Sequence, residues 1–203
     1  MLLVAAMDST SHGDRIARLR TPRAGAYAPA VTDEEAVGRA RELLAEAAAR
    51  LTAAGVPDEA VAAFEPAARR FGVLRRARLR PLGRVWRLGV LLLAADGSVR
   101  ATGAVTRAVA PGHPGHMAVS AEERREVRAA AFRGPFPAGS TVNVDAPPIE
   151  LSPDGLRDGP LLLRDGRVLV RWSLSAGDGA ARDLEAYLGE RVALLLDPPQ
   201  GAS

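Results

Sequence analysis

Histidine is the side chain that most readily combines metal binding with acid–base chemistry near neutral pH, and this sequence contains three. His113 and His116 lie three residues apart, and Asp145 or Glu150 would complete a set of metal ligands. With Asp145 as an orienting carboxylate, the same pair would serve a small hydrolase of the amidohydrolase type. Because residues 111–116 include two prolines and two glycines, no helix is expected to align the histidines. We therefore favour a solvated loop here and expect no metal and no cofactor.

Two absences from the sequence exclude whole classes of enzyme. There is no cysteine and no lysine among the 203 residues, so all 27 basic side chains are arginine. Thiolate nucleophiles, disulfides, Schiff bases, Ser-x-x-Lys pairs and the lysine of phosphate-binding P-loops are thereby ruled out. Neither Gly-x-Ser-x-Gly nor Gly-x-Gly-x-x-Gly occurs. We favour a non-catalytic binding or interaction protein over an enzyme.

Arginine is concentrated in one segment. Eight arginines and no acid lie between Arg69 and Arg87, although the formal net charge of the whole chain is only +3. The residues in this segment predicted to bind an anion are Arg76, Arg78, Arg80, Arg84 and Arg87. One interpretation is an anion or nucleic-acid surface, with nucleic-acid binding at most weak and independent of sequence. The other, which we favour, is a wet strand face whose charges pair with the protein's own acids.

The elements that must position these residues begin with a helix over 33–54. Thr32 and Glu35 have the spacing of a capping box, and Gly55 is expected to end the helix. A short second helix is predicted over 58–64. Beyond it, period-two alternation predicts a strand over 76–80 and a longer strand over 85–94, which an Asp96-Gly97 turn joins to a returning strand over 99–109.

The second half of the chain repeats these signals. A helix is predicted over 121–133, with Ser120 and Glu123 as a capping box, followed by a short strand over 142–145. A second hairpin turns at Asp165-Gly166. A closing helix is expected from Leu184, although 191–196 would also fit a strand. The sequence therefore predicts an α+β fold, an antiparallel sheet with at least two β-hairpins flanked by about three or four helices.

The expected domain organisation is simple. Residues 1–31 are predicted to be a flexible tail, 32–198 a single α+β domain, and 199–203 a disordered C-terminus. The apolar start lacks a basic region, so it does not predict a signal peptide, and Met7 is an alternative start to Met1. No membrane span is expected, and we expect a cytoplasmic protein.

Three stretches carry a family resemblance: Trp86–Leu93 with the Asp96-Gly97 turn and Thr106–Ala108, then Ser120–Glu126, and finally Glu190–Asp197. Over about residues 35–198 the chain resembles a family of short, functionally uncharacterised actinobacterial proteins, some of which are labelled "glutaminase". Serine-type glutaminases require a Ser-x-x-Lys pair and amidotransferase-type glutaminases require a cysteine. Because this chain has neither lysine nor cysteine, the resemblance implies the family and not that activity.

The first prediction concerns this chemistry. Purified protein should carry no stoichiometric metal and should release no ammonia from glutamine, because the His113/His116 pair is not on a helix and the required nucleophiles are absent. Elemental analysis and a coupled ammonia assay check the two halves. One zinc per chain that is lost in a His113→Ala variant would contradict the first half, and glutaminase activity that survives repurification would contradict the second.

Overall fold

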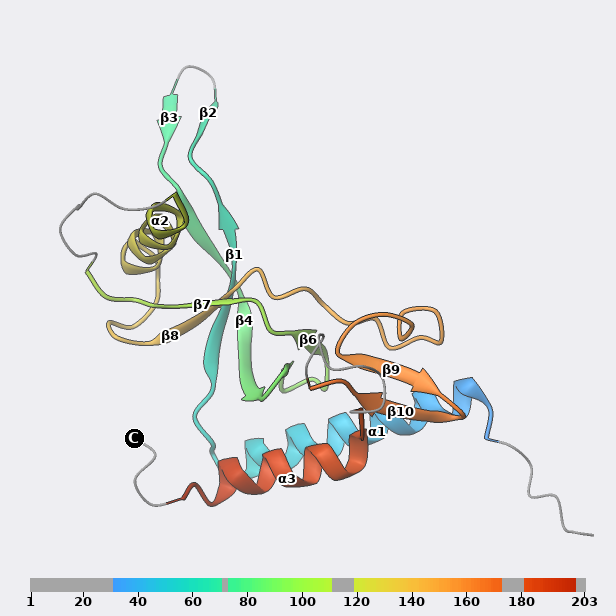
Figure 1. Cartoon of the computed structure of the whole chain (residues 1–203). Helices are drawn as coiled ribbons and strands as arrows, with labels where there is room; N and C mark the ends of the chain where they lie inside the picture. The colour runs from blue at the N-terminus through green and yellow to red at the C-terminus, as the bar shows by residue number, and fades with distance from the viewer. Residues whose placement is uncertain (1–30, 71–72, 111–118, 173–180, 200–203) are drawn as a thin grey trace, which may run out of the picture.

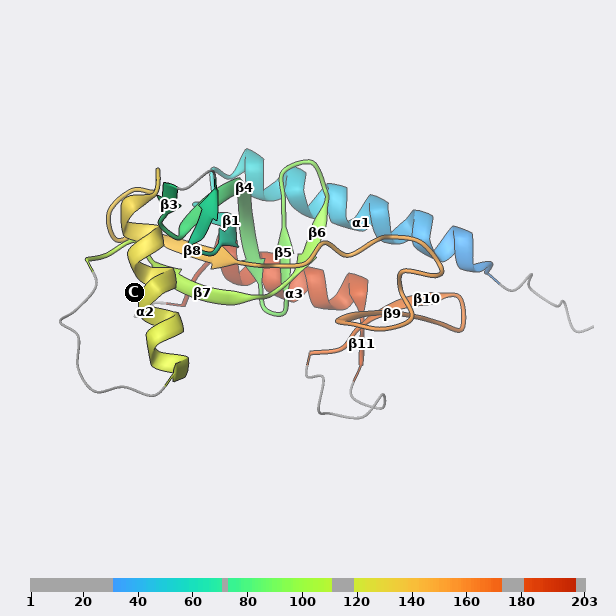
Figure 2. The same ribbon diagram turned by 90° about the horizontal axis from the view of Figure 1, so that it is seen from above.

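A computed structural model describes residues 31–70, 73–110, 119–172 and 181–199. Figures 1 and 2 show helices α1 (Asp33–Ala53) and α3 (Leu184–Leu196) lying side by side along one side of a curled sheet. Helix α2 (Val119–Arg133) packs near the opposite end of the sheet. The fold is α+β, as the sequence predicts. In the part of the chain that the structure describes, no helix has the length and apolar character needed to cross a membrane.

The predicted capping of α1 is confirmed. The Thr32 side chain accepts a hydrogen bond from the Glu35 N–H at 3.2 Å, and the Glu35 carboxylate accepts one from the Thr32 N–H at 2.8 Å. At the other end, the N–H of Val56 donates to the Leu51 carbonyl at 3.1 Å across Gly55, whose φ is 63°. Backbone groups at both ends of the helix find local hydrogen-bond partners, and these contacts fix where the helix begins and ends. One face is fully buried, with Ala36, Val37, Ala40, Leu44, Ala47, Ala48 and Leu51.

The main sheet has six strands in the order β6-β5-β4-β1-β8-β7. They are β1 (Glu59–Glu65), β4 (Arg78–Leu88), β5 (Leu91–Leu93), β6 (Val99–Ala101), β7 (Ala104–Arg107) and β8 (Thr141–Val144). All neighbours are antiparallel except β1 and β8. The predicted strand over 142–145 is confirmed as β8.

This sheet is curled. Strands β6 and β7 stand at the two ends of the order, yet they are consecutive in the chain and separated only by residues 102–103. Two further hydrogen bonds of 2.9 Å join β6 to the segment after β8: Ala101 N–H to the Pro147 carbonyl, and Ile149 N–H to the Val99 carbonyl. The sheet is therefore curled, so that β6 lies against the segment that follows β8.

Three apolar clusters hold the layers together. The largest joins α1 and α3 to Trp86, Leu88 and the hairpin of β9 (Leu161–Arg164) and β10 (Arg167–Val170). A second packs α2 against Ala60, Ala62 and Leu79. A third is formed by Val61, Val85, Leu92 and Ala146 on the opposite face of β1 and β4. Strand β4 thus contributes to all three clusters, and β1 to the second and third.

A smaller antiparallel sheet completes the fold, in the order β11-β10-β9. Its strands are β9 (Leu161–Arg164), β10 (Arg167–Val170) and β11 (Arg182–Asp183). Both predicted hairpins are confirmed: β5 and β6 flank Asp96-Gly97, and β9 and β10 flank Asp165-Gly166. The alternative left open for 191–196 is decided in favour of helix.

Four sequence-based assignments were wrong. The predicted helix over 58–64 is strand β1, because pairing with β4 and β8 outweighs the helix propensity of its alanines. The predicted strand over 85–94 is two strands, since Gly89 and Val90 form a turn between β4 and β5. Helix α2 begins at Val119, so Ser120 lies inside the helix and is not its N-cap. The returning strand over 99–109 is likewise divided into β6 and β7.

Tyr187 fixes the β4–β5 turn to α3. Its buried hydroxyl donates to the Leu88 carbonyl at 2.8 Å and accepts from the Val90 N–H at 3.1 Å. Between these residues, Gly89 has a φ of 64°, and a Cβ there would lie 2.2 Å from the Tyr187 hydroxyl oxygen. The turn requires glycine for its backbone conformation and also for the close approach of the tyrosine.

The second prediction uses a matched pair of glycines. Gly55→Ala should cost roughly 1–2 kcal/mol of stability, because its φ is 63° but nothing lies within 4 Å of the added Cβ. Gly89→Ala should cost about 1–3 kcal/mol more, because Tyr187 must move and leaves buried polar groups of the turn unpaired. Urea denaturation of both variants measures the difference. Equal losses of unfolding free energy would show that the tyrosine contact does not matter.

Candidate anion-binding arm

The most unusual feature of the structure is a projecting two-stranded ribbon. Strands β2 (Ala68–Arg70) and β3 (Val73–Arg75) pair with each other in a sheet of their own. Figure 1 shows them extending away from α1 and α3, beyond the ends of β1 and β4. We call residues 66–70 and 73–77 the arm. From Glu65 to Arg70 it reaches about 17 Å, at ~3.3 Å per residue.

The base of the arm is held by the domain. Ala77 is buried, and its carbonyl accepts a hydrogen bond of 2.8 Å from Arg133 at the end of α2. The β1–β4 pairing beneath it has a bulge where Val61 and Ala62 lie opposite Gly83 and Pro81. A bulge bends a ribbon and increases its twist, so the arm is directed by the sheet below it.

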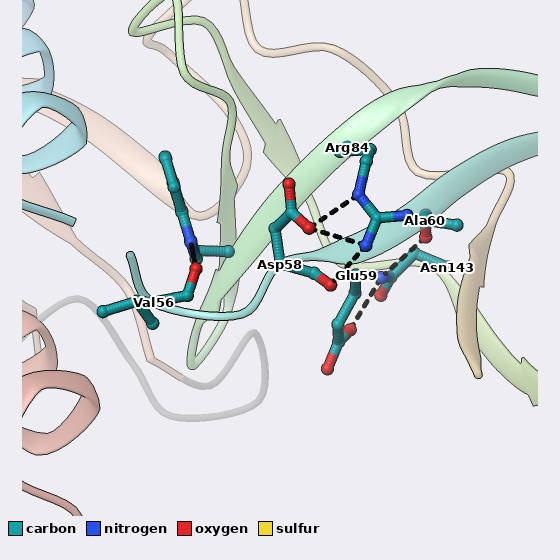
Figure 3. A network of polar contacts seen from close by, with 7 residues as sticks. Val56, Asp58, Glu59, Ala60, Arg84 and Asn143 are labelled. Atoms are coloured by element: carbon teal, nitrogen blue, oxygen red, sulfur yellow. Dashed lines mark hydrogen bonds and ion pairs between the residues drawn. The ribbon is translucent and has the colours of Figure 1, made fainter. Parts of the chain in front are cut away.

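The arginines nearest the body pair with acids at the start of β1 and just before it. The Arg84 guanidinium donates a hydrogen bond to the Asp58 carboxylate at 2.6 Å (Figure 3). Arg87 lies 3.4 Å from Glu59 and donates to the side-chain oxygen of Asn143, which is fully buried. The Asn143 amide nitrogen in turn donates to Glu59 at 2.8 Å and to the Ala60 carbonyl at 3.1 Å. These groups satisfy one another, as buried polar networks must.

Directly below the arm, one carboxylate accepts hydrogen bonds from two arginines. Glu65 accepts from Arg78 at 2.5 Å and from Arg80 at 3.0 Å. The hydrogen bond from Arg78 is the main cause that lowers the pKa of the Glu65 carboxyl, and Arg80 lowers it further. All three side chains are exposed to solvent, which screens both pairs, so neither adds much to stability. Their consequence is that the charges of Arg78 and Arg80 are partly neutralised.

The arginines of the arm itself differ from those below. Arg69, Arg75 and Arg76 are exposed, and none of them makes a hydrogen bond or ion pair with the residues that the structure describes. Arg76 lies outside β4, so it does not continue the strand face of Arg78 and Arg80. Of the five predicted anion-binding arginines, four are paired internally and Arg76 alone remains available. The expected pairing with the protein's own acids therefore applies to the base of the ribbon and not to the arm.

Sequence reasoning did not single out Arg69 and Arg75. The signal that separates them from the rest is the position of the acids: Glu65 is the last one before Asp96. In the observed register Glu65 lies opposite Arg78, so arginines beyond this pair have no carboxylate across the ribbon. The mistaken helix over 58–64 concealed this register.

Of the residues of the alternative hydrolase site, the structure describes only Asp145. His113 and His116 lie outside the described residues. Asp145 has a φ of 52°, and its carboxylate accepts the Phe64 N–H at 2.8 Å, where it extends the pairing of β1 with β8. Among the described residues, no group of three or more histidine, aspartate or glutamate side chains is arranged to hold a metal ion.

One cavity lies far from the arm, between the start of α1, the β9–β10 hairpin and the start of α3. Its volume is about 360 Å³, near the lower limit for a small-molecule site. Its charged lining residues pair with each other, Arg39 with Glu185 at 2.9 Å and Arg167 with Asp183 at 2.8 Å. The cavity therefore offers a ligand little unpaired charge.

Comparison of the chain with protein-family models, curated proteins and solved structures finds no match. The family resemblance described above stays a prediction, and the arm has to be interpreted from its own geometry and charge.

The third prediction tests the charge pairing at Glu65. Its lowered pKa means that this pairing stabilises the fold at neutral pH and that the contribution disappears as the pH falls through the lowered pKa. Arg78→Ala should raise the pKa of Glu65 more than Arg80→Ala, because Arg78 provides the stronger hydrogen bond. NMR titration of the carboxyl carbons measures both shifts.

Glu35 provides the internal control for that titration. Its pKa is lowered by hydrogen bonds from Thr32, which neither substitution touches. A Glu35 pKa that moves together with that of Glu65 would indicate a global change, and an unmoved Glu65 would show that the two arginines do not hold its carboxylate.

Proposed function

We propose that this chain is a non-catalytic binding protein that holds an anionic partner with the arm. The observation that carries this proposal is the contrast along one ribbon. The four arginines at its base have acidic partners, whereas Arg69, Arg75 and Arg76 have none among the described residues. Three exposed guanidinium groups on a projecting ribbon form a site for phosphate, sulfate or carboxylate groups.

The shape of the arm supports a binding role. The ribbon stands away from the domain (Figure 1). Its base is nonetheless fixed, by the Arg133–Ala77 hydrogen bond and by the β1–β4 ladder. A held base with an exposed cationic end can present charge to a partner without clashes from the rest of the domain. A cytoplasmic location, expected from the sequence, belongs to this proposal.

The fourth prediction is retention on an anionic polymer. Wild-type protein should bind heparin–agarose and elute with salt, whereas an Arg69/Arg75/Arg76→Ala variant should elute at distinctly lower salt, because the unpaired cations are gone. The measurement is the salt concentration at elution, with circular dichroism to show that each variant is folded.

The matched control is Arg39/Arg157/Arg182→Ala, which removes the same charge from exposed ion pairs elsewhere. It should elute close to wild type. If both triple variants shift equally, net charge and not the arm determines retention, and the proposal is wrong.

A further inference from the structure

We infer that the partner of the arm is double-stranded DNA, whose major groove receives the ribbon and whose phosphates pair with Arg69, Arg75 and Arg76. This inference rests on the proposed function, since it names the class of anion that the arm binds. The contact between the arm and the duplex is electrostatic and independent of base sequence.

The distribution of charge over the ribbon is the first argument. Arg75 lies directly across from Ala68, so it shares a face with that residue. Arg69 is the next residue along β2, and because successive side chains of a strand point to opposite faces, it lies on the other face. A flat anionic surface would meet only one of the two. A groove presents phosphates on both walls, so both arginines find partners when the ribbon enters it.

The dimensions of the ribbon are the second argument. Two paired strands lie about 4.8 Å apart, and the major groove of B-form DNA, about 12 Å wide, admits a two-stranded ribbon. The reach of about 17 Å exceeds the groove depth of about 8.5 Å, so the domain at the base need not collide with the duplex. Duplex RNA has a deep and narrow major groove, which is a poorer receptor for the same ribbon.

The size of the ribbon argues against a protein surface as its partner. A stable protein interface buries about 800 Å² on each partner, more than two three-residue strands offer. Charge–phosphate pairing needs no such area.

The affinity of the arm for duplex DNA should depend on salt concentration in a predictable way. Neutralising three phosphates gives a slope of log affinity against log salt of about −2.7, at ~0.9 per phosphate. Affinity should therefore fall roughly 40-fold between about 50 and 200 mM salt. Alanine at all three positions should bring the slope close to zero.

The fifth prediction is tested by fluorescence anisotropy with the full chain and a labelled duplex of random sequence, at several salt concentrations. Wild type should give the slope above, with equal affinity for a second duplex of unrelated sequence. The Arg69/Arg75/Arg76→Ala variant should lose this salt dependence. The Arg39/Arg157/Arg182→Ala variant should keep it. An Arg69/Arg75/Arg76→Lys variant should retain most of the slope, because lysine keeps the charge.

Three competitors complete the design: duplex RNA, single-stranded DNA, and vesicles of phosphatidylserine with phosphatidylcholine. The inference requires duplex DNA to bind most tightly. Equal or tighter binding of any competitor overturns it, as does a slope that the alanine variant leaves unchanged. If heparin retention depends on the three arginines but duplex DNA does not bind, the partner is wrong and the proposed function stands. If neither polymer responds to the substitution, both fail.

Discussion

Antiparallel pairing of β1 with β4 is the contact on which the other parts of the structure depend. At one end of β4, Trp86 and Leu88 enter the core that α1 and α3 cover. On β1, Ala60 and Ala62 pack under α2 while Val61 faces the third cluster. Beyond Glu65 and Arg78 the same two strands continue toward the arm. Because one ladder reaches from the helical core to the arm, the orientation of the arm is set by the packing of the domain.

The same ladder also determines where charge is available. Its register places Asp58, Glu59 and Glu65 beside the arginines of β4, so the positive charge near the body is balanced. The pairs at Glu65 are exposed and add little to stability, so their effect is mainly electrostatic. Beyond Glu65 the described part of the ribbon contains no acid. The boundary between paired and unpaired arginine is therefore a consequence of register, and a shift of one residue would disrupt it.

Local signals in the sequence were sufficient for much of the fold. The Thr32–Glu35 box and the Asp96-Gly97 and Asp165-Gly166 turns are determined by neighbouring residues, and all were predicted. Strand β1 was not, because Glu-Ala-Val-Ala-Ala-Phe has no clear alternation and its alanines favour helix when considered alone. The Gly89 turn was hidden within a continuous apolar run, and only the contact with Tyr187 reveals why a glycine stands there.

The candidate site shows the same limit. The sequence identified the basic segment and the acids, but which arginines are neutralised depends on contacts across a ladder whose first strand was assigned as helix. An arginine–carboxylate pair across the ladder depends on the register of two strands, whereas sequence periodicity describes only one strand at a time. For this reason Arg78 and Arg80 looked like the centre of the site, and Arg69 and Arg75, which have no acid across from them, did not.

Projection into solvent explains how unpaired arginines are tolerated in the arm. Like charges on a strand repel, and the repulsion is strong where the surroundings are apolar and weak where water and salt screen it. Nearer the body, the half-buried Arg87 has a carboxylate partner and also bonds to buried Asn143. In the arm, Arg69, Arg75 and Arg76 are exposed, so solvent reduces their repulsion without a carboxylate. The distance from the core that makes their charge tolerable is also what makes it accessible to a polyanion, whose phosphates replace the screening ions on binding.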